Sequence, residues 1–273
     1  MKSDQMFYLK HNSDQHPDAN HYQLHIHDHY EIYVLASGNV EYMVEGRIYP
    51  LRPGSLLLMR DGETHRVIVK ETGLYERYML FLRPELLRRR GFPEELLAPF
   101  TDRALGQRNL YAPAEFPDVP PITYFQKMLH EKAFLPEDDV IEANLRALLC
   151  SVCAAFRRDP LSHERDQKKT LGRDVMAYIN ENLTRELSVE QIAREFHMSP
   201  SQIGRVFRGL TGTSVYHYIL TKRLMMAQAR IAAGEGAVSA SQASGFWDYS
   251  SFYRLYKKHF GVPPSAHAER KIP

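Results

Sequence analysis

The chain has 273 residues and a formal net charge of +2, and 44% of its residues are hydrophobic. This length favours two domains, each large enough to bury its own core. The longest mostly apolar run, Ala147 to Phe156, is far shorter than the ~18 residues that a membrane-spanning helix needs. The N-terminus also lacks the pattern of a signal peptide. We therefore expect a cytoplasmic protein without membrane contacts.

The charge is distributed unevenly along the chain. From Lys168 onward there are 15 Lys and Arg against 8 Asp and Glu, a net charge of +7. The part before Lys168 has 20 against 25, a net charge of −5. A basic C-terminal part suits binding to nucleic-acid phosphates by that part alone, although an ordinary solvated surface also explains a charge of +7.

Short apolar runs, separated by Gly and Pro, follow a polar N-terminal arm of residues 1–20 that we expect to be flexible. Several short strands at regular spacing predict an antiparallel sandwich or barrel. The predicted strands are Glu31–Leu35, Val40–Val44, Ser55–Met59, Arg66–Val69 and Tyr75–Leu82.

Histidine and acidic residues gather around the first predicted strand, in the segment LHIHDHYEIYVLASG. The spacing His25-x-His27-x3-Glu31-x6-Gly38 resembles the first motif of the cupin family. His25 and His27 share one face of a regular strand, because side chains alternate. Glu31 lies roughly 13 Å from His27 along an extended chain, at ~3.3 Å per residue, so a common site requires a turn at residues 28–30.

Pro53-Gly54 followed by His65 resembles the second cupin motif, in the looser form that the sensor domains of AraC-type regulators have. The resemblance spans roughly residues 20–82. It implies a small jelly-roll barrel whose interior can hold a ligand.

Three interpretations of His25, His27, Glu31 and His65 stay open at this point. Imidazole and carboxylate groups suit a divalent metal such as Zn, Fe, Ni, Mn or Cu. The same four side chains also suit a polar effector pocket without a metal, or histidines with a purely structural role.

Helices are predicted after the barrel, at Pro84–Arg90, Glu94–Phe100, Ile122–Leu135 and Glu137–Arg158. In the last of these, Ile141, Leu145, Leu148 and Val152 recur at 4-3-4 spacing. That spacing predicts the seam of a homodimer, and the alternative is core packing within the chain.

Cys150 and Cys153 lie in the same apolar helix, so we expect buried, inert thiols rather than a redox or metal site. Residues 161–169 are charged and predict a linker between domains at 1–160 and 170–273.

Two short helices joined by a tight turn are predicted within residues 188–212. Ser199 is placed to cap the second helix ahead of Pro200. Apolar side chains recur at helical spacing on one face of each helix, and the second helix presents Ser201, Gln202, Arg205 and Arg208 on the other. This is the pattern of a helix-turn-helix, with a solvated helical hairpin as the alternative.

A second copy of the pattern lies within residues 237–261. Ser201-x-Ile203-x-Arg205 recurs, shifted by 49, as Ser250-x-Phe252-x-Arg254, and a repeat at a fixed offset is rarely chance. Residues 214–233 between the copies predict one helix about 30 Å long. This length is close to one turn of B-DNA, roughly 34 Å.

The ending GFWDYSSFYRLYKKHFGVPPSAH resembles the signature of AraC-type (AraC/XylS) bacterial transcription regulators, and the resemblance extends from Leu171 onward. It implies an α+β chain of two domains. The first is a cupin-like β-barrel with dimerisation helices, and the second is an all-α pair of helix-turn-helix units. Ala240, Ser241 and Ser244 depart from the usual apolar pattern, so we expect the first helix of the second unit to pack less tightly.

The function implied by the resemblance is sequence-specific regulation of transcription, controlled by a small polar effector that is often a sugar. The partners are double-stranded DNA, the effector, a second copy of the chain and, for an activator, RNA polymerase. The alternatives are a metal-dependent cupin enzyme carrying a DNA-binding domain, and a regulator with a ligand-free barrel. The predicted DNA contacts are Ser201, Gln202, Arg205, Arg208, Lys222, Arg223, Ser250, Ser251, Arg254, Lys257 and Lys258.

Overall fold

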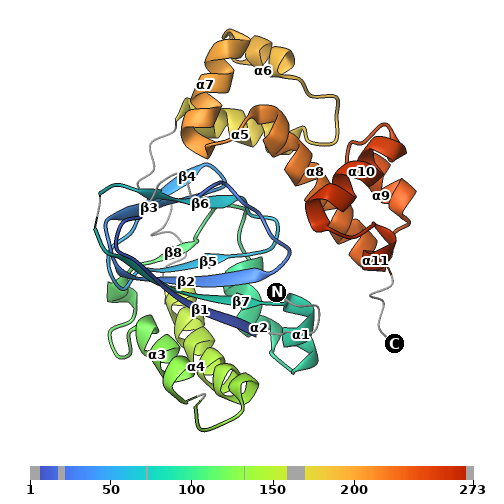
Figure 1. Ribbon diagram of the computed structural model, residues 1–273. Coiled ribbons are helices and arrows are strands. Elements are labelled where there is room, and N and C mark those ends of the chain that lie inside the picture. The colour runs from blue at the N-terminus through green and yellow to red at the C-terminus, as the bar shows by residue number, and fades with distance from the viewer. Residues whose placement is uncertain (1–6, 18–21, 72, 132, 159–169, 269–273) are drawn as a thin grey trace. The chain divides into compact units, whose positions relative to one another are not determined.

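The computed structural model describes residues 7–17, 22–71, 73–131, 133–158 and 170–268 (Figure 1). The chain divides into two compact units, Met1–Lys168 and Lys169–Pro273. The predicted linker, residues 161–169, lies outside the described residues. None of the described helices is long and apolar enough to cross a membrane.

Unit one contains two antiparallel sheets that enclose a barrel-like interior (Figure 1). The larger sheet has the strand order β1-β7-β2-β5-β8 and the smaller has β4-β3-β6. The expected cupin-like barrel is therefore present. The strands are β1 (Phe7–Asp14), β2 (Tyr30–Ser37), β3 (Val40–Val44), β4 (Arg47–Pro50), β5 (Leu56–Met59), β6 (His65–Val69), β7 (Tyr75–Leu82) and β8 (Leu110–Tyr111).

Strand β2 lies between β7 and β5, and both of its faces are covered. Ile32 and Val34 belong to the core cluster that includes the helices, whereas Tyr33 and Leu35 belong to the cluster between the two sheets. Because side chains alternate along a strand, Glu31 lies on the same side as Tyr33. A carboxylate that is 2% exposed is thereby placed inside the barrel.

The helices of unit one pack on the outer face of the larger sheet (Figure 1). They are α1 (Pro84–Arg89), α2 (Glu94–Thr101), the short 3-10 helix η2 (Pro113–Glu115), α3 (Pro121–Glu131) and α4 (Glu137–Arg158). On α4, Leu145, Leu148 and Val152 are fully buried in the same core cluster as strands β2 and β7. The prediction of a dimer seam along this stripe is wrong, because the stripe packs against its own sheet.

Two further expectations for unit one need correction. The N-terminal arm is not wholly irregular, because residues 7–14 form β1 and pair with β7 along their whole length. The two thiols also differ. Cys153 is buried, donates to the backbone oxygen of Glu95 at 3.1 Å, and has its pKa raised by burial to about 11, whereas Cys150 is exposed.

Unit two is entirely helical in its described part, with two helix-turn-helix units joined by α8 (Figure 1). The two second helices, α7 and α10, are each 12 residues long and are related by the predicted offset of 49. Both end at a glycine in the left-handed conformation, Gly212 with φ 76° and Gly261 with φ 73°. The helices are α5 (Leu171–Glu181), α6 (Val189–Glu195), α7 (Pro200–Thr211), α8 (Val215–Ala232), α9 (Ala237–Ala243), α10 (Tyr249–Phe260) and α11 (Ser265–Ala268).

Candidate functional site

Helix α7 buries one face and presents the other to solvent. Ile203 and Phe207 are fully buried, whereas Ser201, Arg205 and Arg208 are exposed. Ser199 and Gln202 form a capping box at its start, in which the Gln202 side chain accepts from the Ser199 backbone N–H at 3.0 Å. The Gln202 amide oxygen is thus already engaged, whereas the Arg205 side chain has no hydrogen bond or ion pair among the described residues.

Helix α10 repeats this arrangement in the second unit. Phe252 and Tyr256 are fully buried, and Asp248 caps the start by accepting from the backbone N–H groups of Ser250 and Ser251. The predicted contact residues on its other face, Ser250, Arg254, Lys257 and Lys258, are exposed. Ser251 is half-buried and accepts from Arg254 Nη2 at 3.2 Å.

Two predicted phosphate contacts on α8 do not fit their positions. Lys222 is 5% exposed, so its ammonium does not face the solvent from which a phosphate would approach. Arg223 donates to the backbone oxygens of Leu183 and Arg185 at 2.7 and 2.6 Å. Arg223 therefore holds α8 within unit two, and the assignment of Lys222 to DNA contact does not fit its burial.

The first helix of the second unit, α9, is enclosed despite its polar residues. Ala240, Ser241 and Ser244 are all at most 1% exposed, contrary to the expected loose packing. Ser241 donates to the Val238 oxygen at 2.7 Å, whereas the Ser244 hydroxyl is buried without a hydrogen-bond partner among the described residues. The departure from the family pattern thus leaves these side chains enclosed, but the unsatisfied Ser244 hydroxyl lowers the free energy of unfolding by about 1–3 kcal/mol.

The four predicted cupin residues come together inside unit one. One ligand atom from each of His25, His27, Glu31 and His65 lies within 4.8 Å of all the others. The chain bends at Asp28 and His29, which supplies the turn that the sequence required. His27 Nε2 lies 3.0 Å from the Glu31 carboxylate, and the backbones of His25 and His65 pair with each other at 3.0 and 2.9 Å.

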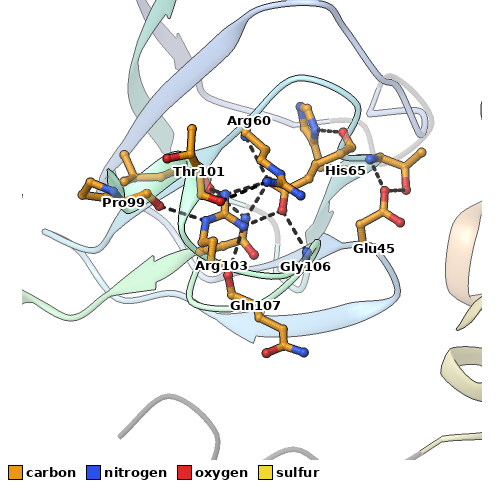
Figure 2. A network of polar contacts seen from close by, with 12 residues as sticks. Glu45, Arg60, His65, Pro99, Thr101, Arg103, Gly106 and Gln107 are labelled. Carbon is orange, nitrogen blue, oxygen red and sulfur yellow. Dashed lines mark hydrogen bonds and ion pairs between the residues drawn. The ribbon is translucent and has the colours of Figure 1, made fainter. Parts of the chain in front are cut away.

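A buried ion pair fixes the loop that carries His65 (Figure 2). The Arg103 guanidinium donates to both carboxylate oxygens of Glu63 at 2.5 and 2.9 Å, and both side chains are fully buried. Arg103 also donates to the backbone oxygens of Pro99 and Gln107, so it joins this loop to α2 and to the segment after it. The backbone oxygen of Glu63 in turn accepts from His65 Nδ1 at 2.9 Å, which directs Nε2 toward Glu31.

The protonation of the cluster follows from its burial and its one carboxylate. Burial lowers the pKa of His27 to about 4 although the Glu31 hydrogen bond opposes it, so its imidazole is neutral at pH 7. Burial alone would lower the pKa of His65, but the hydrogen bond and charge of Glu31 outweigh it and raise that pKa. Burial alone would raise the pKa of Glu31, but its two histidine partners hold it well below the usual range, so Glu31 is ionised.

A cavity of about 220 Å³ opens beside this cluster, between the two sheets. Its lining includes His25 and Glu31, so the cluster forms part of its wall. The Tyr33 and Tyr75 hydroxyls share a hydrogen bond of 2.9 Å, whereas the Tyr42 hydroxyl has no hydrogen-bond partner among the described residues. The lining residues are Lys10, Asn12, Tyr22, Gln23, His25, Glu31, Tyr33, Tyr42, Val67, Tyr75, Arg77, Met79 and Phe81.

Both units match known families. Residues 13–91 match the family model of an AraC-like ligand binding domain, and residues 192–270 match that of a helix-turn-helix domain. The first match contains the histidine cluster and the second contains both recognition helices, α7 and α10. The chain belongs to the AraC family of transcription regulators.

Relatives of this AraC-family regulator are similar over most of its length. An uncharacterised HTH-type transcriptional regulator, YfiF of Bacillus subtilis, is 23% identical over 90% of this chain and 79% of its own length. The HTH-type transcriptional activator RhaS of Salmonella schwarzengrund is 22% identical over 88% of this chain and 85% of its own length. Among solved structures, ToxT from Vibrio cholerae is 12% identical and covers 97% of this chain and 98% of that chain, with a TM-score of 0.41. The two family models give the regulator an N-terminal ligand-binding domain and a C-terminal helix-turn-helix DNA-binding domain.

Sequence reasoning missed most of the cavity of this regulator. Arg77 is 8% exposed, donates to Asp14 at 2.6 Å, and has its guanidinium carbon 4.2 Å from the centre of the Tyr75 ring. Tyr75 and Arg77 lie on the same face of β7 and point into the cavity, but the sequence pattern does not show which face of this strand is turned inward. Only the pairing of β7 with β1 and β2 settles that choice.

Proposed function

We propose that the AraC-family regulator binds a small polyhydroxylated effector, of the sugar class, in the 220 Å³ cavity of unit one. The observation that carries this proposal is Tyr42, whose side chain lines the cavity and whose hydroxyl lacks a hydrogen-bond partner among the described residues. Because a tyrosine hydroxyl can both donate and accept, a ligand hydroxyl there would gain a hydrogen bond that the free protein does not make.

The rest of the lining supports the same ligand class. The Glu31 carboxylate accepts hydrogen bonds, and the hydroxyls of Tyr33 and Tyr75 both donate and accept. Arg77 is paired with Asp14 on the cavity wall, so its charge is neutralised before any ligand arrives. A ligand that exchanges many hydrogen bonds without carrying charge fits this lining better than an anion does.

A divalent metal is the second candidate ligand. Three imidazoles and one carboxylate converge within 4.8 Å, and the buried His65 Nε2 lies 3.3 Å from the Glu31 carboxylate. This donor set fits zinc, iron, nickel or manganese. When bound, such an ion would polarise a ligand hydroxyl in the adjoining cavity. His25, His27, Glu31 and His65 would hold it.

We propose that the barrel senses its ligand and catalyses no reaction. Its relatives YfiF and RhaS are named as a transcriptional regulator and a transcriptional activator. The cavity adjoins the cluster within a chain whose second unit carries two recognition helices. A cupin enzyme with a DNA-binding domain would instead consume a substrate of the cavity.

A homodimer through the exposed face of α4 completes the proposed function. This face presents Ala143, Ala147, Cys150 and Ala154 at 4-3-4 spacing. The helix starts with exposed Glu137, Asp138 and Asp139 and ends with exposed Arg157 and Arg158. In an antiparallel pair that sets Ala147 against Cys150 of the second copy, Asp139 meets Arg158 and the charges complement each other.

The effector proposal is tested by thermal unfolding of the full chain with a panel of sugars and, separately, with divalent metals. A bound sugar should stabilise the protein by about 2.7 kcal/mol at a concentration 100 times its Kd, and it should change DNA affinity. Tyr42→Phe should weaken that sugar roughly 2- to 10-fold by removing one hydrogen bond. Tyr8→Phe is the matched control, since Tyr8 is 39% exposed and does not line the cavity.

The metal content of the purified protein shows whether the cluster binds a divalent metal in addition to, or instead of, a sugar in the cavity. If the cluster binds a metal, the wild-type protein should carry close to one ion, and Glu31→Gln should lose most of it while staying folded. Stabilisation by neither sugars nor metals would contradict an effector role for the barrel. Release of a chemically altered sugar would contradict a purely sensing role and would favour a cupin enzyme that carries a DNA-binding domain.

A further inference from the structure

The start of helix α10 carries an exposed aromatic surface. Trp247 is 81% exposed, and Tyr249 and Tyr253 are each 38% exposed. The rings of Tyr249 and Tyr253 lie 6.5 Å apart, and Tyr249 also contacts the buried Phe252 at 5.7 Å. A hollow of about 400 Å³ beside these rings is lined by Tyr249, Ser250, Tyr253 and Arg254. Tyr249 and Tyr253 thus line one hollow, and the exposed Trp247 lies two residues before Tyr249 in the chain. Exposed apolar groups at a hollow indicate a binding site.

The first helix-turn-helix has nothing comparable at the equivalent positions. Under the offset of 49, Tyr249 corresponds to Pro200, and Tyr253 corresponds to Gly204. Trp247 likewise corresponds to Met198, which is half-buried. The positions of the arginines are the same in both helices, Arg205 and Arg254. The two recognition helices thus have the same arrangement of arginines but differ at these three positions, where aromatic side chains are found only in the second unit.

We propose that the second recognition helix reads thymine through its 5-methyl group, by contact with Trp247, Tyr249 and Tyr253. The first helix, by contrast, reads by hydrogen bonding through Arg205. In the major groove the thymine methyl is the one apolar group that a protein can recognise. An aromatic surface therefore specifies thymine-rich sequence in the half of the operator that α10 contacts. The proposal rests on DNA binding by unit two and adds the base class read by its second half.

Charge favours DNA over a protein partner as the occupant of this surface. Arg254, Lys257 and Lys258 are exposed on the same helix, and the part of the chain from Lys168 onward carries a net charge of +7. Asp248 lies beside the aromatic rings, but it caps the helix by accepting from Ser250 and Ser251. A cationic helix with an apolar tip complements a phosphate-lined groove that contains methyl groups.

The aromatic surface is also held in place before DNA arrives. Tyr249 packs on Phe252, and Phe252 contacts Tyr256 and Phe246 in the core of the second unit. Two of the three exposed rings therefore lie on a helix that is anchored at its base. Preorganised aromatic side chains lose little conformational freedom on binding, which suits a contact that must discriminate one methyl group.

The test begins with selection of binding sites from random DNA by the full-length protein. The selected sites should contain a thymine-rich stretch about one helical turn away from a stretch that requires guanine. Each thymine of that stretch is then replaced by deoxyuridine, which removes only the methyl. Binding should weaken about fourfold for each methyl that is buried, whereas the same replacement in the other half should have little effect.

Variants assign the effect to the aromatic surface. Tyr253→Ala and Trp247→Ala should weaken binding to thymine DNA and bring the ratio between thymine and deoxyuridine affinities close to 1. Arg205→Ala is the matched control, and it should weaken binding while leaving this ratio unchanged. A variant that merely loosened the fold would lower the affinity for thymine DNA and for deoxyuridine DNA by the same factor, so the wild-type ratio would remain. Such a result for Tyr253→Ala and Trp247→Ala would overturn the proposal.

Trp247 provides an independent readout in the wild-type protein, because it is the only tryptophan in the sequence. Its emission should shift and become protected from a soluble quencher when the selected DNA is added. If DNA binds and Trp247 stays accessible, the aromatic surface faces something else. Loss of transcription activation by Trp247→Ala with unchanged DNA binding would assign the surface to a protein partner. Absence of any DNA binding at low salt would contradict the DNA-binding function itself.

Discussion

Glu63 and Arg103 control the geometry of the sensing cluster although neither lines the cavity. Their bidentate ion pair is fully buried, and Asn109 donates a further hydrogen bond of 2.9 Å to the same carboxylate. Removing one partner of such a pair leaves an uncompensated charge and costs about 3–5 kcal/mol. The destabilisation falls on the loop that directs His65 toward Glu31, so stability is coupled to the proposed ligand binding.

The pH dependence of this pair can be predicted with its sign. Burial alone would raise the pKa of Glu63, but the Arg103 ion pair outweighs it and lowers that pKa below its ordinary value of 4.5. The unfolded chain therefore binds the proton first, and the stability that Glu63 contributes is complete above about pH 4.5 and is lost as the pH falls further. Glu63→Gln should unfold at lower denaturant concentration at pH 7 and lose part of the wild-type acid sensitivity. Equal acid sensitivity in both proteins, measured by urea unfolding from pH 7 to pH 3.5, would show that the pair does not contribute.

Helix α4 shows at the scale of one element how a pattern can have two meanings. The 4-3-4 stripe of Ile141, Leu145, Leu148 and Val152 fits a dimer seam and a core equally well, because both bury one face of a helix. The structure places this stripe in the core. The small residues beside it, including Ala143 and Ala147, occupy the exposed face.

Neighbouring substitutions on α4 separate the two faces. Leu148→Ala removes a fully buried side chain and should lower the free energy of unfolding by about 2–5 kcal/mol without changing the oligomeric state. Ala147→Glu lies on the exposed face and should leave the unfolding energy nearly unchanged while converting the proposed dimer to a monomer. Urea unfolding and light scattering measure the two properties. A stable monomer from Leu148→Ala, or a dimer that persists in Ala147→Glu, would place the contact elsewhere.

The sequence predicted elements well where periodicity and boundary signals agree. The bounds of β3, β7 and α4 match those predicted, because apolar alternation or a helical stripe ends there at Gly, Pro or charged residues. Strands β1, β4 and β8 were not predicted, because they lie at sheet edges where one face is polar and the alternation is weak. The histidine cluster could be predicted from motif spacing, whereas Tyr42 and Arg77 enter the cavity only through strand pairing. Lys222 was misassigned because charge alone does not show burial.

At the scale of the whole molecule, sensing and DNA binding belong to separate units with separate cores. The barrel and its helices share clusters within residues 7–156, and α8, α9 and α10 share a cluster of their own. The basic excess from Lys168 onward lies in the second unit almost entirely. A fragment of residues 168–273 should therefore fold and bind DNA alone.

The salt dependence of that fragment tests the division of labour. Arg208, Lys257 and Lys258 are exposed on the two recognition helices and are not assigned to base reading. Each phosphate that they neutralise should contribute about −0.9 to the slope of log affinity against log salt, so the slope should approach about −2.7 if all three take part. Lys257→Ala should make the slope less steep by about one such contribution, whereas Lys222→Ala should not alter it, because Lys222 is buried.

The same fragment shows what the first unit contributes to affinity. Without unit one the fragment lacks the proposed α4 contact, so on two adjacent half-sites it should bind about 100- to 10,000-fold more weakly than the full chain, because linked sites raise the effective concentration. On a single half-site the two proteins should bind equally, and only the full chain should respond to the effector. Equal binding on paired half-sites would mean that the full chain acts as a monomer. Failure of the fragment to bind at low salt would mean that the second unit requires the first for its fold or its DNA contact.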